Sequence, residues 1–331
     1  MGYTVKKYED EDSLMWDAFV ENDAINGSFL QTRRFLNYHP KDRFTDFSCL
    51  VFGPKGHLVA VCPACEKVQG DKILVSHAGS TYGGVIIHKK YFKINKVIEI
   101  LNCLEEFWKE NNFKQLIIKQ TPNILSKEKN DLFQYAFKYN RFSDFYELNL
   151  YVDFEQYSEN ILSEIAQGKR TNVNNCQKRG LYCKKLTTFE EIVQLHNLLS
   201  ITLMKYNRTP IHTAREIYEF QTDRLKKECQ CFGIYENDKM IAASMMFYFH
   251  SVKVAHTQYL CADPEYNKLS PMTFMYYSML KEMRKEGFNK VSWGIVTEDM
   301  GRELNEGLAR SKEDFGSKYE INPIYVKVLE E

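Results

Sequence analysis

A segment in the middle of the chain has the composition of a phosphate-binding site. Residues 165–189 contain no acidic side chain but six basic ones, Lys169, Arg170, Lys178, Arg179, Lys184 and Lys185. Ammonium and guanidinium groups bind phosphate oxygens well. Asn172 and Asn175 lie about one helical turn apart and could bind hydroxyl groups or a base. We therefore predict that Lys169, Arg170, Asn172 and Asn175 bind an acceptor that carries a diphosphate-linked sugar; the alternative is a solvated helix face.

Two histidines and a tyrosine are candidates for acid–base catalysis. The alternation of residues 252–260 predicts a strand with His256 and Gln258 on one face and Tyr259 on the other. A neutral imidazole can accept a proton from an ammonium group near neutral pH, so His256 is our first candidate for a general base. His212 and Tyr259 are further catalytic candidates. The structural alternatives are a satisfied core histidine at position 256 and a residue that starts a helix at position 212.

A glycine-rich turn and one glutamine are further candidates for ligand contact. Residues 79–84 contain three glycines, which permit positive φ and close approach of the backbone to a ligand. Tyr82, in the middle of the turn, offers an aromatic face to a sugar or base. Gln31 could contact the ligand or cap a helix. We assign Gln31 and Tyr82 to the acceptor site, with an ordinary loop as the alternative for the turn.

The elements that must position these residues form an internal repeat. A predicted strand, turn and strand at residues 49–61 recur at 232–243. Each copy continues in the same order, with a further strand (73–76; 252–260), an amphipathic helix (94–111; 271–286) and a short apolar strand (115–119; 290–293). In the second copy Ser270 is the predicted N-cap, Pro271 the first helical residue and Gly287 the C′ residue.

The repeat predicts two similar α/β domains whose mixed sheets are flanked by helices. A strand at 145–154 closes the first domain, so we place the boundary between residues 153 and 154. A basic helical connector, 154–180, opens the second domain, with helices at 155–165 and 169–179. The pairs Thr188/Glu191 and Thr213/Glu216 have capping-box spacing and predict two more helix starts.

Composition narrows the class of protein. The 331 residues are 44% hydrophobic and 27% charged, which is typical of globular domains, and 44 basic residues balance 44 acidic ones. A DNA-binding protein usually has a basic surplus, so we do not expect DNA as a partner. We find neither a membrane span of ~20 apolar residues nor a secretion signal, and we expect a cytoplasmic protein. Among the nine cysteines, Cys62 and Cys65 have the spacing of a metal knuckle, but the only remote partner is the tighter pair Cys229 and Cys231. We therefore predict no metal and interpret Cys62 and Cys65 as buried reduced thiols.

Two α/β copies joined by a helical segment resemble the double-domain members of the GNAT (Gcn5-related N-acetyltransferase) superfamily, the FemABX-like proteins. Four short motifs carry the resemblance: Trp16 with Ser28-Phe29-Leu30-Gln31-Thr32; the turn Gly79 to Gly84; Lys169-Arg170-Thr171-Asn172 with Asn175 and Lys178-Arg179-Gly180-Leu181; and Gly307-Leu308 with Lys312, Phe315 and Gly316. The likeness extends over nearly the whole chain.

The resemblance implies two tandem GNAT-like domains with a cleft between them, the first on the acceptor side and the second on the acyl-donor side. Acyl-CoA would be a co-substrate, with no permanently bound cofactor. It would lie beside a splayed strand, which we place at 240–249, with its pyrophosphate on the helix that starts at Pro271. Lys268 and Ser270 would bind this donor, and Asn305 and Lys312 match family positions near the donor channel. Residues 267–270 lack the glycines of the superfamily's pyrophosphate loop.

The predicted function is transfer of an acyl group from acyl-CoA to the amine of a sugar, most simply a nucleotide-linked amino sugar used for cell-surface polysaccharide. A first alternative is a Fem-type transferase that takes an amino acid from aminoacyl-tRNA to a peptidoglycan precursor. The zero net charge favours the first function over tRNA binding, which remains possible. A second alternative is a non-catalytic module that binds a glycan precursor.

Overall fold

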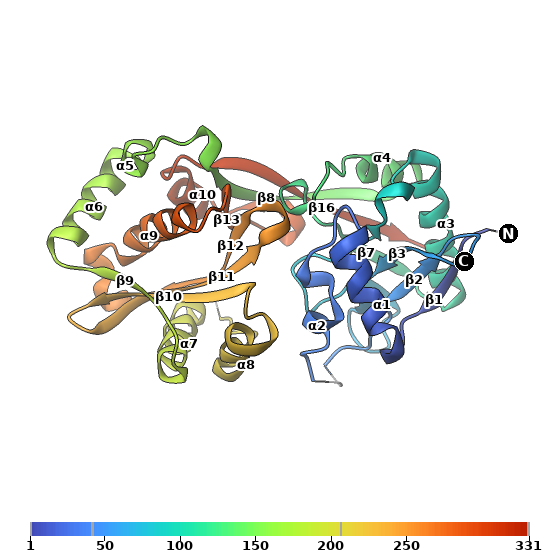
Figure 1. The fold of residues 1–331 in the computed structure, drawn as a ribbon, viewed down its shortest axis with the longest axis horizontal. Helices are drawn as coiled ribbons and strands as arrows, with labels where there is room; N and C mark the ends of the chain where they lie inside the picture. The colour runs from blue at the N-terminus through green and yellow to red at the C-terminus, as the bar shows by residue number, and fades with distance from the viewer. Residues whose placement is uncertain (1, 41–42, 206, 330–331) are drawn as a thin grey trace. The chain divides into compact units, whose positions relative to one another are not determined.

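The computed structural model describes residues 2–40, 43–205 and 207–329, which form two compact units (Figure 1). Unit 1 combines Met1–Leu148 with Thr297–Glu303 and Glu320–Glu331, and unit 2 combines Asn149–Val296 with Leu304–Tyr319. Two long strands, β8 (Ser143–Asp153) and β16 (Lys318–Val328), contribute residues to both units. The predicted boundary at 153/154 falls at the end of β8, whereas the compact units divide within that strand. The division into two similar α/β domains between residues 153 and 154 stays a prediction.

The described residues of unit 1 form mostly short strands and the helices α1 to α4. Its elements in chain order, besides its parts of β8 and β16, are β1 (Thr4–Lys7), α1 (Ser13–Ala18), α2 (Arg33–Leu36), β2 (Cys49–Phe52), β3 (Leu58–Cys62), β4 (Ala64–Glu66), β5 (Ile73–Ser76), β6 (Ile86–Ile87), α3 (Ile94–Glu110), β7 (Gln115–Lys119) and α4 (Leu132–Tyr139). A four-stranded sheet has the order β1-β2-β3-β6, and a second sheet contains the run β4-β5-β7-β16-β8.

Strands β2, β3 and β6 of the four-stranded sheet are apolar throughout and almost entirely buried, whereas the edge strand β1 is partly exposed. Leu50, Val61 and Ile86 pack with Trp16 of α1 on one face. The alternating residues of β2 and β3 join the larger core, in which α3, α4 and β7 also take part. Continuous apolar strands of this kind must be covered on each side, and α1 and α3 provide the cover.

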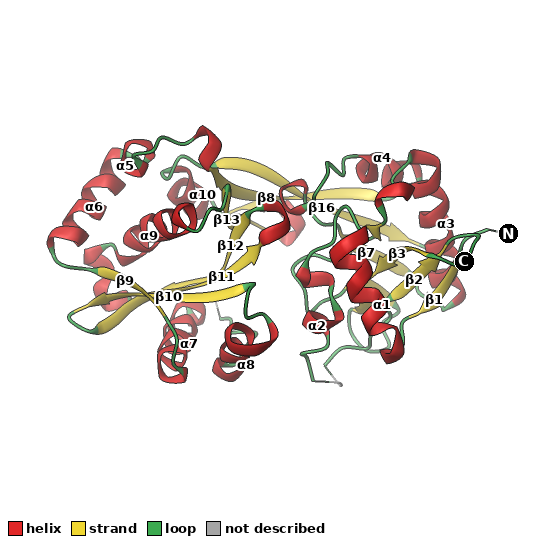
Figure 2. Ribbon diagram, viewed as in Figure 1, coloured by secondary structure: helices red, strands yellow, loops and turns green. Residues whose placement is uncertain are grey.

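Unit 2 contains a mixed sheet in the order β8-β13-β12-β11-β10-β9. Its elements in chain order are α5 (Ile161–Glu164), α6 (Gln167–Lys178), β9 (Tyr182–Lys185), α7 (Phe189–Met204), α8 (Ala214–Glu219), β10 (Cys229–Glu236), β11 (Lys239–Phe249), β12 (Val254–Ala262), α9 (Pro271–Lys285), β13 (Lys290–Ile295) and α10 (Glu306–Glu313). A two-stranded ribbon joins β14 (Thr297–Glu298) and β15 (Glu303–Leu304), and all of its residues except Leu304 belong to unit 1. Helices α6 and α9 lie on one face of the unit 2 sheet, and α7 and α8 lie on the other (Figure 2).

Most predicted elements are confirmed, because their signals are local. Both capping boxes form, at Thr188 and Thr213, and Gly180 and Gly287 follow helices with φ of 82° and 83°. The helix predicted at 155–165 is wrong: that stretch holds only a 3₁₀ turn and the four-residue helix α5. Ser270 does precede α9, but its φ is 55° and its side chain makes no capping hydrogen bond.

The predicted repeat is confirmed in the order of its elements but not in their pairing. In unit 2 the hairpin β10–β11 continues directly into β12 as one sheet. In unit 1 the hairpin β2–β3 pairs with β1 and β6, whereas β5 lies in the other sheet beside β7. Hydrophobic periodicity predicts a strand but not the sheet it joins.

Candidate active site

Strands β12 and β13 stop pairing at His256. Their parallel register covers only residues 254–256 against 290–292, although both strands continue further. Soon afterwards Gly294 has a φ of 81°, a conformation that favours glycine. Strand β11, in contrast, pairs along its length with both neighbours. The predicted splaying of 240–249 is therefore wrong, and the strands that part are β12 and β13.

His256 is buried and has one nitrogen fixed by a chain of hydrogen bonds. Its Nδ1 lies 3.0 Å from the Ser292 hydroxyl, which donates to Asn149 Oδ1 at 3.0 Å. Since the single hydroxyl proton of Ser292 points to Asn149, Nδ1 is the donor and Nε2 carries the lone pair. Nε2 makes no hydrogen bond with any of the residues that the structure describes. Burial, with the charge of Lys312 as a smaller cause, lowers the pKa of His256 to about 4.

Ser292 and Asn149 are the residues that sequence reasoning missed. Each is a polar residue on an apolar strand and is almost fully buried, with exposed fractions of 2% and 1%. A buried polar side chain needs a partner, so a lone polar residue in a predicted buried strand is the signal that could have found them. Their pairing with His256 depends on the order of strands β8, β13 and β12.

The three predicted catalytic residues belong to one face of the unit 2 sheet. A β-bulge at Gln258 shifts the register, so that His256 opposes Phe247 and Tyr259 opposes Met245. The alternation that placed Tyr259 on the opposite face from His256 is therefore wrong. The Tyr259 hydroxyl is hydrogen-bonded to Nδ1 of His212, which is also buried.

Lys312 provides a buried amine beside the point where the strands part. Its Nζ donates to the carbonyl oxygens of Gly294 and Ile295, each at 3.0 Å, and the residue is 3% exposed. Burial lowers its pKa to about 7, so both protonation states are populated near neutral pH. An ammonium group has three donors, and the third remains for a ligand. Asn305, the other residue predicted here, caps α10 through Oδ1, which accepts from the Leu308 amide at 3.0 Å, and thereby positions the helix that carries Lys312.

The start of α9 has the free amides that an anion requires. Because Ser270 does not cap the helix, its side chain leaves the first amides unbound. The backbone N–H groups of Met272 and Thr273 make no hydrogen bond among the described residues. Lys268 lies in the preceding 3₁₀ turn with an exposed side chain. These groups could hold a phosphate although the loop has no glycine.

Acidic residues from elsewhere in unit 2 neutralise most of the basic segment. The ion pairs are Lys169–Asp314 at 3.9 Å, Arg179–Glu236 at 2.5 Å, Lys184–Glu191 at 2.5 Å and Lys185–Glu286 at 2.6 Å. Four of the six basic side chains therefore have an acidic partner, which lowers the local positive charge below what the lack of acids within the segment indicates. Arg170 and Lys178 have no ion-pair partner within the described part of the chain. Asn172 is partly exposed and Asn175 exposed on the same helix, α6, so all four predicted phosphate ligands lie on one helix.

In unit 1 the structure shows protein contacts for Gln31 and Tyr82. Gln31 is fully buried, and its Oε1 accepts from the Ser28 amide at 2.8 Å in a capping box. Its Nε2 donates to the Tyr82 carbonyl and to Thr121 Oγ1, each at 3.3 Å. The Tyr82 ring is 4% exposed and its hydroxyl accepts from Asn322 Nδ2 at 3.2 Å. Capping, one of the two alternatives for Gln31, is thus what the structure shows, and contact of either residue with a ligand stays a prediction.

The turn at 79–84 needs its glycines for its own packing. A Cβ on Gly84 would lie 2.1 Å from Gln120 Oε1, at a φ of 77° that already strains other residues. We expect Gly84→Ala to lower the free energy of unfolding by about 2–4 kcal/mol, measured by urea denaturation. Gly70 is a matched control, because it has a φ of 86° but open space around its Cβ position. An equal loss for Gly70→Ala would show that the backbone angle, and not the contact with Gln120, sets the cost.

The described residues contain no group of three or more His, Cys, Asp or Glu side chains that could hold a metal ion. Cys62 and Cys65 are buried free thiols, as predicted. Among the described helices, none has the length and apolar character to cross a membrane.

Comparison with known proteins links this geometry to a family. Residues 167–302 match the family model of the acetyltransferase (GNAT) domain, and this range includes His212, His256, the parting strands and the start of α9. No curated protein sequence matches the chain.

Solved structures match over nearly the whole chain. FemX is 14% identical, with a TM-score of 0.67, and the match covers 98% of this chain and 97% of that one. L-PGS from Bacillus licheniformis is 12% identical (TM-score 0.62; coverage 96% and 92%), and a tandem GNAT protein from the clavulanic acid biosynthesis pathway is 10% identical (TM-score 0.59; coverage 98% of both chains). At these identities the similarity shows the fold, which is that of tandem GNAT proteins.

Proposed function

We propose that this chain, whose residues 167–302 match the GNAT domain model and whose fold is that of tandem GNAT proteins, transfers an acyl group from acyl-CoA to the amine of an amino sugar. The proposed acceptor is nucleotide-linked and serves cell-surface polysaccharide synthesis. The observation that carries the proposal is the end of β12–β13 pairing at His256, where backbone polar groups become available beside Lys312. A thioester could lie along this edge with its carbonyl near a cationic donor.

The chemistry that we propose is direct attack. The acceptor nitrogen forms a bond to the thioester carbonyl carbon, the C–S bond breaks, and CoA leaves as a thiolate that takes up a proton. His256 Nε2 accepts the proton that the amine loses. The third N–H of Lys312 would stabilise the negative charge that develops on the carbonyl oxygen. The free amides of α9, with Lys268 and Ser270, would hold the CoA pyrophosphate.

Thiol release tests the proposal. We expect release of CoA only when an acyl-CoA and an amino-sugar nucleotide are both present, with equal amounts of N-acylated sugar formed. Controls with the corresponding N-acetylated sugar nucleotide, whose amine is blocked, should release no thiol. Stabilisation by the nucleotide sugar without turnover would instead support the non-catalytic binding module.

A Fem-type aminoacyl-tRNA-dependent transferase is the second candidate, and the similarity to FemX over both whole chains favours it. The ion pairs that neutralise residues 169–185 argue against it, because tRNA affinity depends on many free phosphate-binding cations. Activity with charged tRNA and none with acyl-CoA would establish this candidate and contradict the first.

Arg170 is a predicted phosphate ligand whose guanidinium has no ion-pair partner among the described residues, whereas Lys169 is paired with Asp314. We expect Arg170→Ala to raise KM for the acceptor about tenfold with little change in kcat, since a remote phosphate contact contributes uniform binding. The measurement is steady-state kinetics with varied acceptor. Arg215→Ala is a control, because Arg215 is an exposed arginine paired with Glu219 on α8. A KM unchanged by Arg170→Ala would remove the phosphate assignment.

A further inference from the structure

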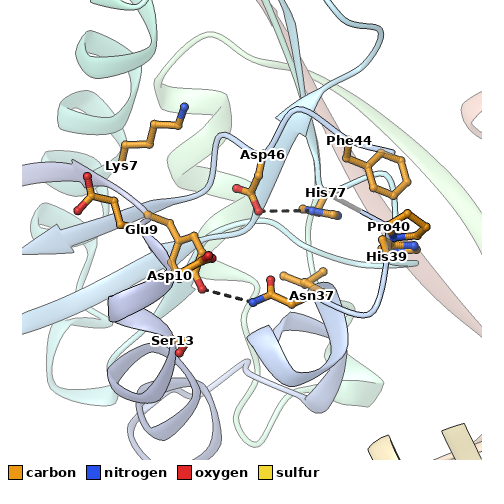
Figure 3. A pocket seen from close by; sticks show the side chains of 12 residues that line it. Lys7, Glu9, Asp10, Ser13, Asn37, His39, Pro40, Phe44, Asp46 and His77 are labelled. Atoms are coloured by element: carbon orange, nitrogen blue, oxygen red, sulfur yellow. Dashed lines mark hydrogen bonds and ion pairs between the residues drawn. The ribbon is translucent and has the colours of Figure 1, made fainter. Parts of the chain in front are cut away.

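Unit 1 contains a pocket that the acyl-transfer proposal does not use. It has a volume of about 610 Å³, and residues that line it include Tyr8, Asn37, His39, Phe44, Asp46 and His77 (Figure 3). These residues come from the segment after β1, the end of α2, the loop before β2 and the segment after β5. Distant parts of the sequence thus converge on one hollow.

Asp46 presents a fixed carboxylate to this pocket. Its Oδ1 accepts from the Ser48 amide at 2.7 Å and its Oδ2 from Arg33 Nη1 at 2.5 Å. Arg33 is almost completely buried, with its guanidinium over the rings of Tyr8 and Trp16 at 3.4 and 4.5 Å from their centroids. One third of the Asp46 side chain remains exposed. Although burial opposes ionisation, His77 and Arg33 hold the pKa of Asp46 well below its usual range, so the carboxylate is charged.

His77 orients this carboxylate and is itself occupied. Its Nδ1 accepts from the Gly79 amide at 3.2 Å, so Nε2 carries the proton and faces Asp46 Oδ2 at 3.7 Å (Figure 3). Because neither ring nitrogen is available to a substrate, the arrangement is suited to binding and not to proton transfer.

Aromatic rings stand beside the carboxylate. The Phe44 ring packs edge-on against His39 and His77, with centroid distances of 4.8 and 5.2 Å, and Tyr8 forms another wall. Asp10 adds a carboxylate at the exposed rim, where Glu9 is ion-paired with Lys6 at 3.4 Å. Lys7, the lysine among the lining residues, keeps its Nζ over the Phe47 ring at 4.5 Å. A charged carboxylate next to aromatic faces attracts an organic cation by ion pairing and by cation–π interaction.

We propose that this pocket of unit 1 binds a protonated primary amine carried on a compact ring or chain, with the ammonium group on Asp46 and the carbon body against Phe44 and Tyr8. The site goes beyond the acyl transfer proposed above and needs no acyl donor. Its ligands lie in unit 1, whereas His256 and Lys312 lie in unit 2, so either proposal can fail alone.

Isothermal titration of the wild-type chain without acyl donor tests the site. The probes are glucosamine, a ring-borne amine, and 1,5-diaminopentane, a chain-borne amine; N-acetylglucosamine and glucose are neutral controls. We expect at least one amine to bind at least about tenfold more tightly than the neutral sugars, because only the amines supply an ammonium group that can hydrogen-bond to the charged Asp46 carboxylate. Binding of glucosamine but not of the diamine would identify a ring-borne ligand. Binding of the diamine but not of glucosamine would identify a chain-borne ligand. Binding of N-acetylglucosamine that is as tight as the binding of the best amine, or no binding of either amine, would overturn the proposal.

Variants locate the binding. Asp46→Asn should weaken amine binding about tenfold. Since this change also removes the partner of buried Arg33, Phe44→Leu and Asp10→Asn serve as variants that leave the Arg33 pair intact, each with an expected loss of about two- to fivefold. Glu99→Gln, on the exposed side of α3, is the control and should bind like the wild type. If both Phe44→Leu and Asp10→Asn bind the amine with wild-type affinity, the amine does not bind in this pocket and the proposal is wrong.

Discussion

Replacement of His256 by alanine should lower kcat by about two orders of magnitude, because loss of a general base costs 10²- to 10⁴-fold. Nε2 of this imidazole has no hydrogen-bond partner in the part of the chain that the structure describes, whereas Nδ1 is hydrogen-bonded to Ser292. The measurement is kcat with saturating acyl-CoA and acceptor. Ser292→Ala should lower kcat about tenfold. The variant loses the hydrogen bond that fixes the imidazole tautomer, but the imidazole itself is still present as the base.

The pH profile separates a base from a structural histidine. With a pKa of about 4, His256 is neutral at and above pH 5, so its acidic limb in kcat/KM should fall as the pH drops through about 4. An unperturbed histidine would place that limb near pH 6.5. The limb should be absent from His256→Ala and present in the control His250→Ala, in which an exposed histidine beyond β11 is removed. If His256→Ala keeps the wild-type profile, the residue is structural.

Lys312→Met should reduce kcat about 10²- to 10³-fold, which is the usual cost of removing a donor that stabilises a developing oxyanion. Methionine matches the length and apolar stem of lysine but supplies no N–H group. The charged form of Lys312 is the one that would act, and it is lost as the pH rises through about 7. The wild type should therefore have a basic limb near pH 7 that Lys312→Met lacks. A variant with wild-type kcat would exclude Lys312 from the site.

The same substitution should reveal the cost of burying the amine. In the unfolded chain a lysine stays protonated up to a pKa near 10.4, whereas in the folded chain Lys312 loses its proton above about 7. Between these values the unfolded state binds more protons, so stability rises with pH. The free energy of unfolding of the wild type relative to Lys312→Met should increase by about 2–5 kcal/mol from pH 7 to pH 10. Lys55→Met, at an exposed turn, is the control and should show no such trend.

Local signals in the sequence determined the elements of this protein. The capping boxes at Thr188 and Thr213, the glycines after α6 and α9, and the apolar alternation of the strands depend on residues within one or two turns of each other. The family resemblance rested on such short motifs, and residues 167–302, which include the motif at 169–181, match the GNAT domain model. The failure at 155–165 fits the same explanation, since an amphipathic pattern without tertiary support does not make a long helix.

Only the tertiary structure decided what the candidate residues can do. The bulge at Gln258 moves Tyr259 to the face of His256, and the order of β8, β13 and β12 brings Asn149 and Ser292 to the imidazole. Similarly, two basic residues of the segment form ion pairs with Glu236 and Glu286, which are distant in the sequence. The composition of the segment does not indicate these partners. Register, bulges and ion pairs join residues that are distant along the chain, and their energies depend on burial. Periodicity and composition contain no information on contacts between distant residues or on burial. The sequence therefore identified the chemical groups, and the fold determined their partners.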